Sequence, residues 1–212
     1  MLLALLAFIW LIPIVWLLVT SFSSYKGINT MHFFPQRWSL DNYMQLFFRP
    51  DTVANFPAWF RNSLIIGAAT CVISTLFVLM VAYAMSCMRF PARKQLMSIA
   101  IILGMFPGVL SMIAIYFVMK LLGLTDSMAG LIIIYSAGSG LGYLICKGFF
   151  DTIPVSLRES AKLEGASELS ILVKIVIPLS KPIVVYTVIN AFLNPWMDFV
   201  MAKLMILSLI HI

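Results

Sequence analysis

Long uncharged stretches alternate with short polar ones along this chain. A helix needs about 20 apolar residues to cross roughly 30 Å of hydrocarbon, and five stretches meet or approach this length: residues 2–22, 62–88, 95–119, 127–146 and 182–207. The pattern predicts an all-α fold in which a polytopic bundle of transmembrane helices forms one domain over residues 1–212.

Proline and glycine residues within these stretches indicate local breaks. Pro13 loosens the first stretch, and Pro107-Gly108 bends the third near its middle, because proline removes a backbone donor. The glycines of residues 138–142 superficially resemble a nucleotide-binding loop, but they follow no strand and no lysine accompanies them. We interpret them as small residues that allow close helix packing.

Composition places the chain in a membrane. It is 62% hydrophobic and 10% charged, with a mean hydropathy of +1.04, whereas globular domains are about a quarter charged. The net charge of +6 does not indicate nucleic-acid binding, because the basic residues lie between apolar runs and no basic helix is interleaved with aromatic residues.

Residues that could carry catalysis or bind a metal are few and scattered. The three cysteines, at positions 71, 87 and 146, lie in or beside apolar stretches without short spacing. His32 and His211 are far from each other and from any acidic cluster. We therefore expect no metal site, no catalytic residue and no cofactor in this chain.

Basic residues predict the orientation. If the spans alternate, residues 89–94 and 147–181 connect them on one side, and these connections hold eight of the fourteen Lys and Arg, three in the first and five in the second. The positive-inside rule places this side in the cytoplasm, together with the N-terminus. Residues 23–61 then form an external segment. We expect the first stretch to be retained, because it lacks a basic n-region and exceeds the usual length of a signal peptide.

The cytoplasmic connection 147–181 is charged and contains helix signals. Ser156-Leu-Arg-Glu159 fits a capping box, and Pro154 suits the approach to a helix start. These residues predict a helix from Leu157 to about Glu164, with Gly165 as its left-handed C-cap.

A second short helix is predicted to begin at Ser167 and to be limited by Pro178. Two short helices are marginal alone, so the pair needs a partner surface. It offers apolar contacts from Leu157, Ala161, Leu163 and Leu169, and polar ones from Arg158, Glu159, Lys162 and Glu164. The alternative is a helix that rests on lipid, but such helices carry a strongly basic face, and this connection balances five basic residues with four acidic ones.

The connection also carries a family motif. Glu159-Ser-Ala161-(x)3-Gly165-(x)9-Ile175-x-Ile177-Pro178 resembles the EAA motif of membrane subunits in binding-protein-dependent ABC importers. Four further segments resemble the maltose-type, oligosaccharide-importing subgroup: Ala82-Tyr-Ala, Met88-Arg-Phe-Pro91, Met105-Phe-Pro-x-Val-Leu-Ser111 and Lys147-Gly-Phe-Phe. The resemblance covers residues 10–205. Ser160 departs from the usual second alanine and Glu164 from the common aspartate.

The resemblance implies the type I permease fold of ABC importers, in which this connection forms a coupling helix that sits in a cleft of an ATP-hydrolysing subunit. It assigns ATPase-coupling roles to Glu159, Ser160, Ala161, Glu164, Gly165, Ala166 and Pro178. The implied partners are a second permease subunit, cytoplasmic ATP-binding subunits that bind the ATP and Mg, an extracytoplasmic solute-binding protein and the lipid bilayer. Family members begin with a basic tail and end with a sixth span, so we expect this sequence to be a fragment.

By the same resemblance the chain is no enzyme but a multi-pass subunit of the bacterial cytoplasmic membrane that translocates a carbohydrate similar to maltodextrin or a galactooligosaccharide. The alternative is a self-sufficient channel or secondary transporter with a cytoplasmic docking loop. Such a protein is expected to carry ionisable residues in several spans, and the second, third and fourth have none. A membrane enzyme would need a polar catalytic cluster, and none occurs.

A candidate solute path follows one face of the last stretch, where three polar residues are spaced by four: Tyr186, Asn190 and Asn194. Asp198 continues the series. These residues either line a wet cavity or hold neighbouring helices together. Trp196 offers an aromatic face for a pyranose ring. Asp198 lies about 24 Å along the helix from Pro182, where it is either solvated or paired with Lys203.

Overall fold

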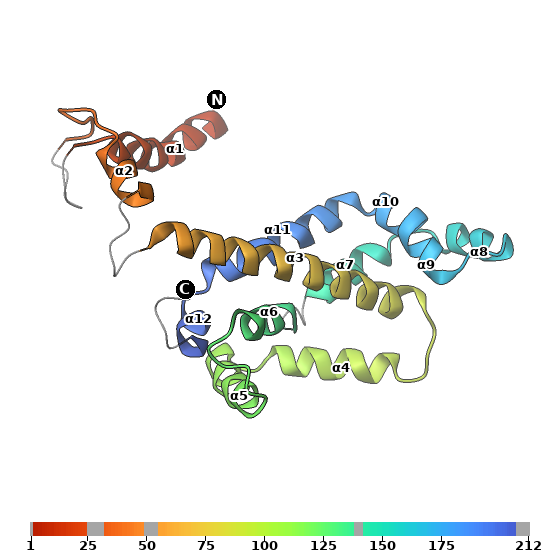
Figure 1. Cartoon of the computed structure of the whole chain (residues 1–212). Coiled ribbons are helices and arrows are strands. Elements are labelled where there is room, and N and C mark those ends of the chain that lie inside the picture. Colours follow the sequence, from red (N-terminus) through yellow and green to blue (C-terminus); the bar gives the residue numbers. More distant parts are fainter. Residues whose placement is uncertain (1, 25–31, 49–54, 138–141, 207–212) are drawn as a thin grey trace. The chain divides into compact units, whose positions relative to one another are not determined.

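The computed structural model describes residues 2–24, 32–48, 55–137 and 142–206. The described elements are helices, as predicted, and the only strand-like pairing among the described residues is one isolated bridge between Ser23 and Trp38. The chain divides into two units, residues 1–60 and 61–212, and Figure 1 shows the elements of each.

The first unit contains α1 (Leu2–Ser21) and α2 (Asp41–Phe48). No residue of α1 is buried within the chain, and Pro13 lies inside the helix without ending it. The Ser21 hydroxyl lies 2.6 Å from the Tyr43 hydroxyl, and the Asn42 amide donates to the carbonyls of Ser21 and Ser23 at 3.2 and 2.8 Å. The segment predicted to be external thus contains the helix α2. Its residue Asn42 supplies hydrogen bonds to carbonyls at the end of α1, which have no partner within that helix.

Helix α3 (Phe56–Cys87) is 32 residues long and begins before residue 62, where the sequence pattern placed its start. The Asn55 side chain accepts a hydrogen bond from the Ala58 amide at 3.2 Å, and Pro57 occupies the first turn, where its missing donor costs nothing. The uncharged pattern did not reveal this first turn because it lies among polar and aromatic residues.

The third predicted span is broken rather than bent. Its two helices, α4 (Arg93–Gly104) and α5 (Gly108–Leu121), meet at 105°. Pro107 has an extended backbone, with ψ of 127°, and a proline disfavours the helical conformation in the residue before it. The bend predicted at Pro107-Gly108 thus lies where the structure has this break.

The fourth predicted span consists of α6 (Met128–Ala137) and α7 (Gly142–Phe150), which are bent by 42°. Residues 138–141, where we predicted close helix packing by glycines, lie outside the described residues. Helix α7 continues to Phe150, beyond residue 146, where the sequence predicted the end of this span.

The connection holds α8 (Val155–Leu163), α9 (Glu168–Ile171), the π-helical turn η1 (Leu172–Val176) and α10 (Ile177–Leu179). The second helical segment passes Pro178 by one residue and ends at Leu179, close to the limit that the sequence predicted. The π-helical turn η1 lies just before the proline. Its wider helix moves away the carbonyl of the preceding turn, with which the ring of Pro178 would otherwise clash. At Ser180 the helical axis then turns by 93° into α11.

The last predicted span is also divided. Helix α11 (Lys181–Met197) contains Pro195 in its last turn and ends two residues later, and α12 (Val200–Met205) follows. Proline leaves one carbonyl of the preceding turn without its usual donor, which favours this ending. Residue 207 lies outside the described part.

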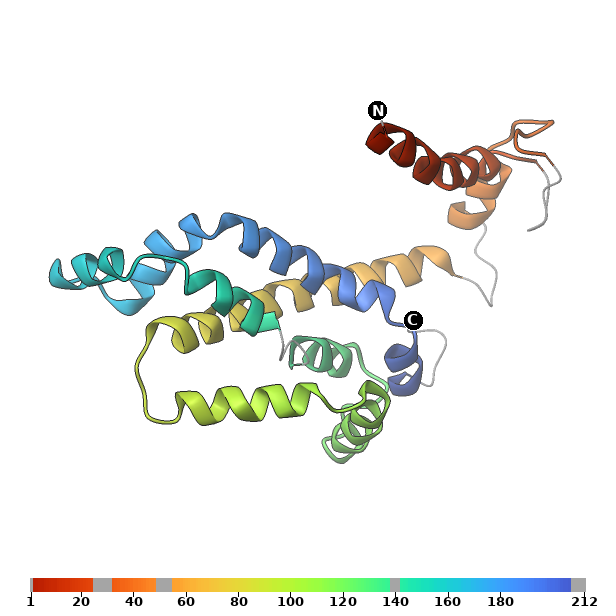
Figure 2. The same ribbon diagram turned by 180° about the vertical axis from the view of Figure 1, so that it is seen from behind.

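Among the described helices, α1 and α3 are each long and apolar enough to cross a membrane, and five spans result if each bent pair counts as one. In the second unit, α8 and α9 lie at the same end as the α3–α4 connection, while α5 and α12 lie at the opposite end (Figures 1 and 2).

Two apolar clusters stabilise these ends. One joins the second half of α3 to α7, α9 and η1, with Phe150, Ile171 and Val176 fully buried. The other joins the first half of α3 to α5, α6 and α12.

The packing of α3 against α11 depends on Gly67. A Cβ at this position would lie 2.7 Å from the Trp196 indole nitrogen, so we expect Gly67→Ala to destabilise the protein by about 1–3 kcal/mol through overpacking. The measurement is the thermal unfolding midpoint of the purified protein in detergent. Gly148→Ala in α7 is the control, because its Cβ would meet nothing within 4 Å and alanine favours helix. Equal losses in both variants would contradict the prediction.

Candidate functional site

The coupling helix predicted from the motif is α8, and its start differs from the prediction. The N-cap is Pro154, with extended ψ of 129°, and no side chain caps this end. The Leu157 amide donates to the Pro154 carbonyl at 3.3 Å. The predicted capping box of Ser156 and Glu159 is therefore wrong, because the extended proline already provides the conformation of an N-cap residue and both side chains fall within the helix.

The end of α8 agrees with the prediction. Gly165 has a φ of +84°, its amide donates to the Lys162 carbonyl at 3.0 Å, and the Ala166 amide donates to the Ala161 carbonyl at 2.9 Å. This pair of bonds is the Schellman motif. The Ser167 hydroxyl then accepts from the Ser170 amide at 3.3 Å and begins α9. The bend between the two helices is thus fixed by backbone bonds.

Helix α8 presents apolar side chains to the outside. It has no fully buried residue, and Leu163 is 91% exposed, with Leu157 and Leu169 exposed as well. Ala161, which we predicted to contact the partner, packs against the cluster of α3, α7 and α9 instead, as does Ala166. The other residues of the predicted coupling set are exposed: Glu159, Ser160, Glu164, Gly165 and, on α10, Pro178.

One carboxylate ties α8 and α9 to α3. Glu168 accepts a hydrogen bond from the Tyr83 hydroxyl at 2.5 Å through one oxygen, and its other oxygen lies 2.5 Å from the Lys162 amino group. The hydrogen bond from Lys162, followed by that from Tyr83, holds the pKa of this carboxyl below 4.5. We call Tyr83, Lys162 and Glu168 the clasp. Sequence reasoning did not identify Tyr83 or Glu168, which are 85 positions apart.

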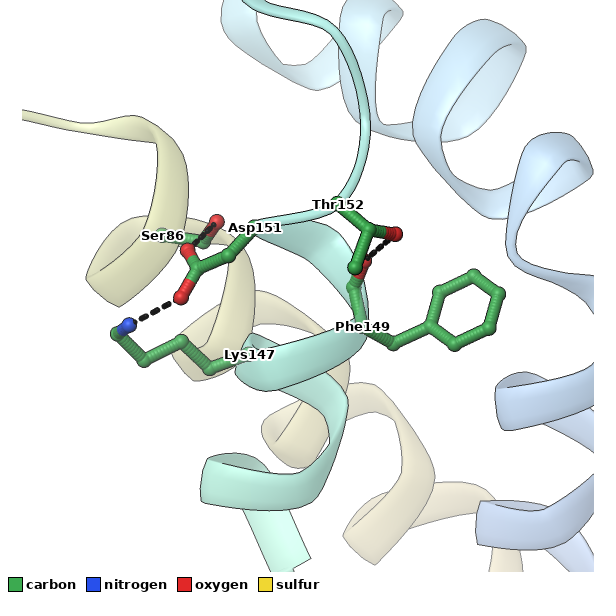
Figure 3. A network of polar contacts seen from close by, with 5 residues as sticks. All are labelled: Ser86, Lys147, Phe149, Asp151 and Thr152. Atoms are coloured by element: carbon green, nitrogen blue, oxygen red, sulfur yellow. Dashed lines mark hydrogen bonds and ion pairs between the residues drawn. The ribbon is translucent and has the colours of Figure 1, made fainter.

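A second network fastens the end of α7 to the end of α3 (Figure 3). Asp151 accepts from the Ser86 hydroxyl at 2.6 Å and pairs with Lys147 at 2.5 Å. Burial raises the pKa of Asp151, but the hydrogen bonds from Lys147 and Ser86 outweigh it and hold this pKa below 3.8. Asp151 thus connects the end of α7 to the end of α3.

The candidate solute path lies on an open cleft of about 470 Å³. Its polar lining comes from three helices: Tyr186, Asn190 and Asn194 of α11, Ser74 of α3 and Tyr135 of α6. The Asn190 amide donates to the Tyr186 carbonyl at 2.8 Å. Sequence reasoning missed Ser74, although Thr70 and Ser74 repeat the spacing of four along α3.

Asp198 does not line this cleft, because α11 ends at Met197. Its carboxylate accepts from the Met201 amide at 3.0 Å and lines a separate cavity of about 160 Å³. The Lys203 amino group lies 5.5 Å from the centre of the Phe199 ring. Trp196 lines the same smaller cavity, its ring lies tilted beside that of Phe192 with centroids 5.8 Å apart, and it does not line the larger cleft.

Comparisons with known proteins agree with this architecture. Residues 80–210 match the family described as binding-protein-dependent transport system inner membrane component. The galactooligosaccharides transport system permease protein GanQ of Bacillus subtilis is 33% identical over 96% of this chain and 72% of its own length. The maltodextrin transport system permease protein MdxG of the same organism is 31% identical over 91% of this chain and 69% of its own.

A solved structure has the same fold. One chain of a bacterial ABC transporter involved in the import of the acidic polysaccharide alginate superposes with a TM-score of 0.85 and 25% sequence identity. The alignment covers 99% of the present chain and 73% of the other. The matched family region includes α8, its glycine turn and the clasp.

Proposed function

Because the chain belongs to the family of binding-protein-dependent transport system inner membrane components, among sugar ABC importer permeases, we propose that it translocates an oligosaccharide and is driven by a separate ATPase through α8. Chains of this family are membrane subunits and not enzymes. The proposed partners are a second permease subunit, cytoplasmic ATP-binding subunits that bind ATP and Mg, and an extracytoplasmic solute-binding protein. The proposed location is the cytoplasmic membrane, crossed several times.

The observation that carries the ATPase coupling is the exposure of α8. Leu157, Leu163 and Leu169 are exposed on a short surface segment, although burying one such side chain contributes about 1.5–3 kcal/mol. A helix of nine residues is also marginal without a partner. These apolar residues, beside exposed acidic ones, suit insertion into a cleft of another protein.

In the proposed mechanism, closure of the ATPase displaces α8, and the clasp passes this movement to α3. Gly165 and the Ser167 cap keep α8 and α9 at a fixed angle, so the pair moves as one body rather than flexing. The network of Asp151 carries the same displacement into α7. Rigid-body movement of these helices opens the polar cleft alternately to the two sides of the membrane.

The proposed substrate is an oligosaccharide of the maltodextrin or galactooligosaccharide type, the solutes named for GanQ and MdxG. The described residues that line the cleft offer neutral hydroxyl and amide groups and include no charged side chain, which suits hydrogen bonding to an uncharged sugar. The experiment is uptake of radiolabelled maltotriose and galactotetraose by cells that express the chain with its partner subunits. Uptake that persists without a functional ATPase would favour the alternative of a self-sufficient transporter.

Removing the side-chain amide of Asn194 tests the role of the cleft. We expect Asn194→Ala to raise the KM for uptake by about two- to tenfold, because one neutral hydrogen bond contributes about 0.5–1.5 kcal/mol. Val185→Ala, on an exposed part of α11 outside the cleft, is the control and should leave KM unchanged. Unchanged KM in both variants would place the sugar contacts elsewhere.

A further inference from the structure

A polar cleft of about 570 Å³ separates the coupling helices from the end of α3. Four cationic residues line it, Arg89, Arg93, Arg158 and Lys162, together with two carboxylates, Glu159 and Glu168. Glu168 is already engaged by Tyr83 and Lys162. The lining therefore carries a net charge of about +2, four cations less two anions.

One cation of this cleft has a buried hydrogen-bond donor that the described part of the chain does not satisfy. The Arg158 Nε atom is buried and, within the described part of the chain, has no hydrogen-bond partner. A buried donor without a partner costs about 1–3 kcal/mol, so an anion that enters the cleft would remove this cost. Arginine is also suited to bidentate recognition of phosphate.

The position of the cleft indicates which anion it receives. Helix α3 ends at Cys87, and Met88 and Arg89 follow at once, so the cleft opens where a spanning helix leaves the hydrocarbon. Met88 and Val155 are exposed at its edge and place apolar surface beside the cations. Basic pockets at the cytoplasmic ends of membrane helices bind the head groups of anionic lipids.

We propose that this cleft binds the phosphate of an anionic phospholipid, such as phosphatidylglycerol, from the cytoplasmic leaflet. The bound phosphate would lie between Arg89 and Arg93 on one side and Arg158 on the other, and would hold α8 against the end of α3. Lipid composition would thereby modulate the coupling between ATP hydrolysis and transport. This inference rests on the cytoplasmic location and coupling role of α8 under the proposed function.

The test uses the assembled transporter in nanodiscs of phosphatidylcholine with and without phosphatidylglycerol. Native mass spectrometry measures the retained phosphatidylglycerol, and ATP hydrolysis measures its effect. We expect Arg89→Gln and Arg93→Gln each to lower the affinity for this lipid about tenfold or more, since each removes a charge-assisted hydrogen bond to the phosphate in addition to a surface charge. Lys94→Gln is the control, because Lys94 is a neighbouring exposed cation that does not line the cleft.

Several outcomes would overturn the proposal. Equal losses in the Lys94→Gln and Arg93→Gln variants would show general surface attraction instead of a site. Loss of the ATPase subunit from the arginine variants, with unchanged lipid retention, would show that the cleft receives acidic residues of the partner protein. Stimulation by inorganic phosphate in phosphatidylcholine alone would identify a soluble ligand. Sugar uptake by the variants in cells is measured in parallel, so that failure of the lipid site is distinguished from failure of the proposed function.

Discussion

Replacing Gly165 with valine is expected to lower ATP-driven sugar uptake at least tenfold, with the chain still inserted in the membrane. The residue has a φ of +84°, which costs an L-amino acid about 1–2 kcal/mol and is a particular outlier for a β-branched side chain. A Cβ there would meet no atom within 4 Å. The damage therefore acts through the backbone, which loses the Schellman bonds and with them the angle between α8 and α9.

The measurements are sugar uptake, ATP hydrolysis and co-purification of the ATPase subunit, all of which we expect to fall. Gly123→Val is the matched control. Gly123 also has a left-handed backbone, with φ of +67°, and open space around its Cβ, but it lies in the turn between α5 and α6. The backbone strain in this variant is similar to that in Gly165→Val, but the coupling helix is unchanged. We therefore expect its uptake to stay within about twofold of normal. Equal loss in both variants would show that backbone strain alone damages the protein.

Local signals in the sequence were sufficient for the features that depend on a few adjacent residues. Gly165 and Ser167 mark the end of one helix and the start of the next, and the structure has both. The break at Pro107 was located for the same reason, since proline restricts its own φ and the residue before it.

Features that depend on tertiary packing could not be predicted in this way. The helix passes Pro178 because a π turn precedes it, and no local pattern predicts that turn. The face shared by Asn190 and Asn194 was visible in the sequence, but the partners opposite it, Ser74 and Tyr135, come from helices whose arrangement was unknown. Tyr83 is an unremarkable residue of an apolar span until the fold brings Glu168 to it.

The clasp gives the second large effect. We expect Glu168→Ala and Tyr83→Phe each to raise the number of ATP molecules hydrolysed per sugar several-fold, because α8 then moves without displacing α3. The double variant should resemble either single one, since both remove the same connection. In a double-mutant cycle of thermal stability, we expect an interaction free energy of about 1 kcal/mol, reduced from that of a buried charged hydrogen bond because Glu168 is partly exposed. Additive effects on stability and on coupling would contradict a shared role.

The pH dependence of the clasp provides an independent check. Its hydrogen bonds, first from Lys162 and then from Tyr83, lower the pKa of Glu168 below 4.5 in the folded protein, so the ionised form favours folding. This stabilisation is fully present above about pH 4.5 and is lost as the pH falls through the lowered pKa. The difference in unfolding midpoint between the natural protein and Glu168→Gln should therefore be constant from pH 7 to pH 5 and shrink below pH 4.5. Glu164→Gln, which removes an exposed carboxylate outside the clasp, is the control variant. A difference for Glu168→Gln that grows on acidification would mean that its carboxylate is not stabilised by these two donors.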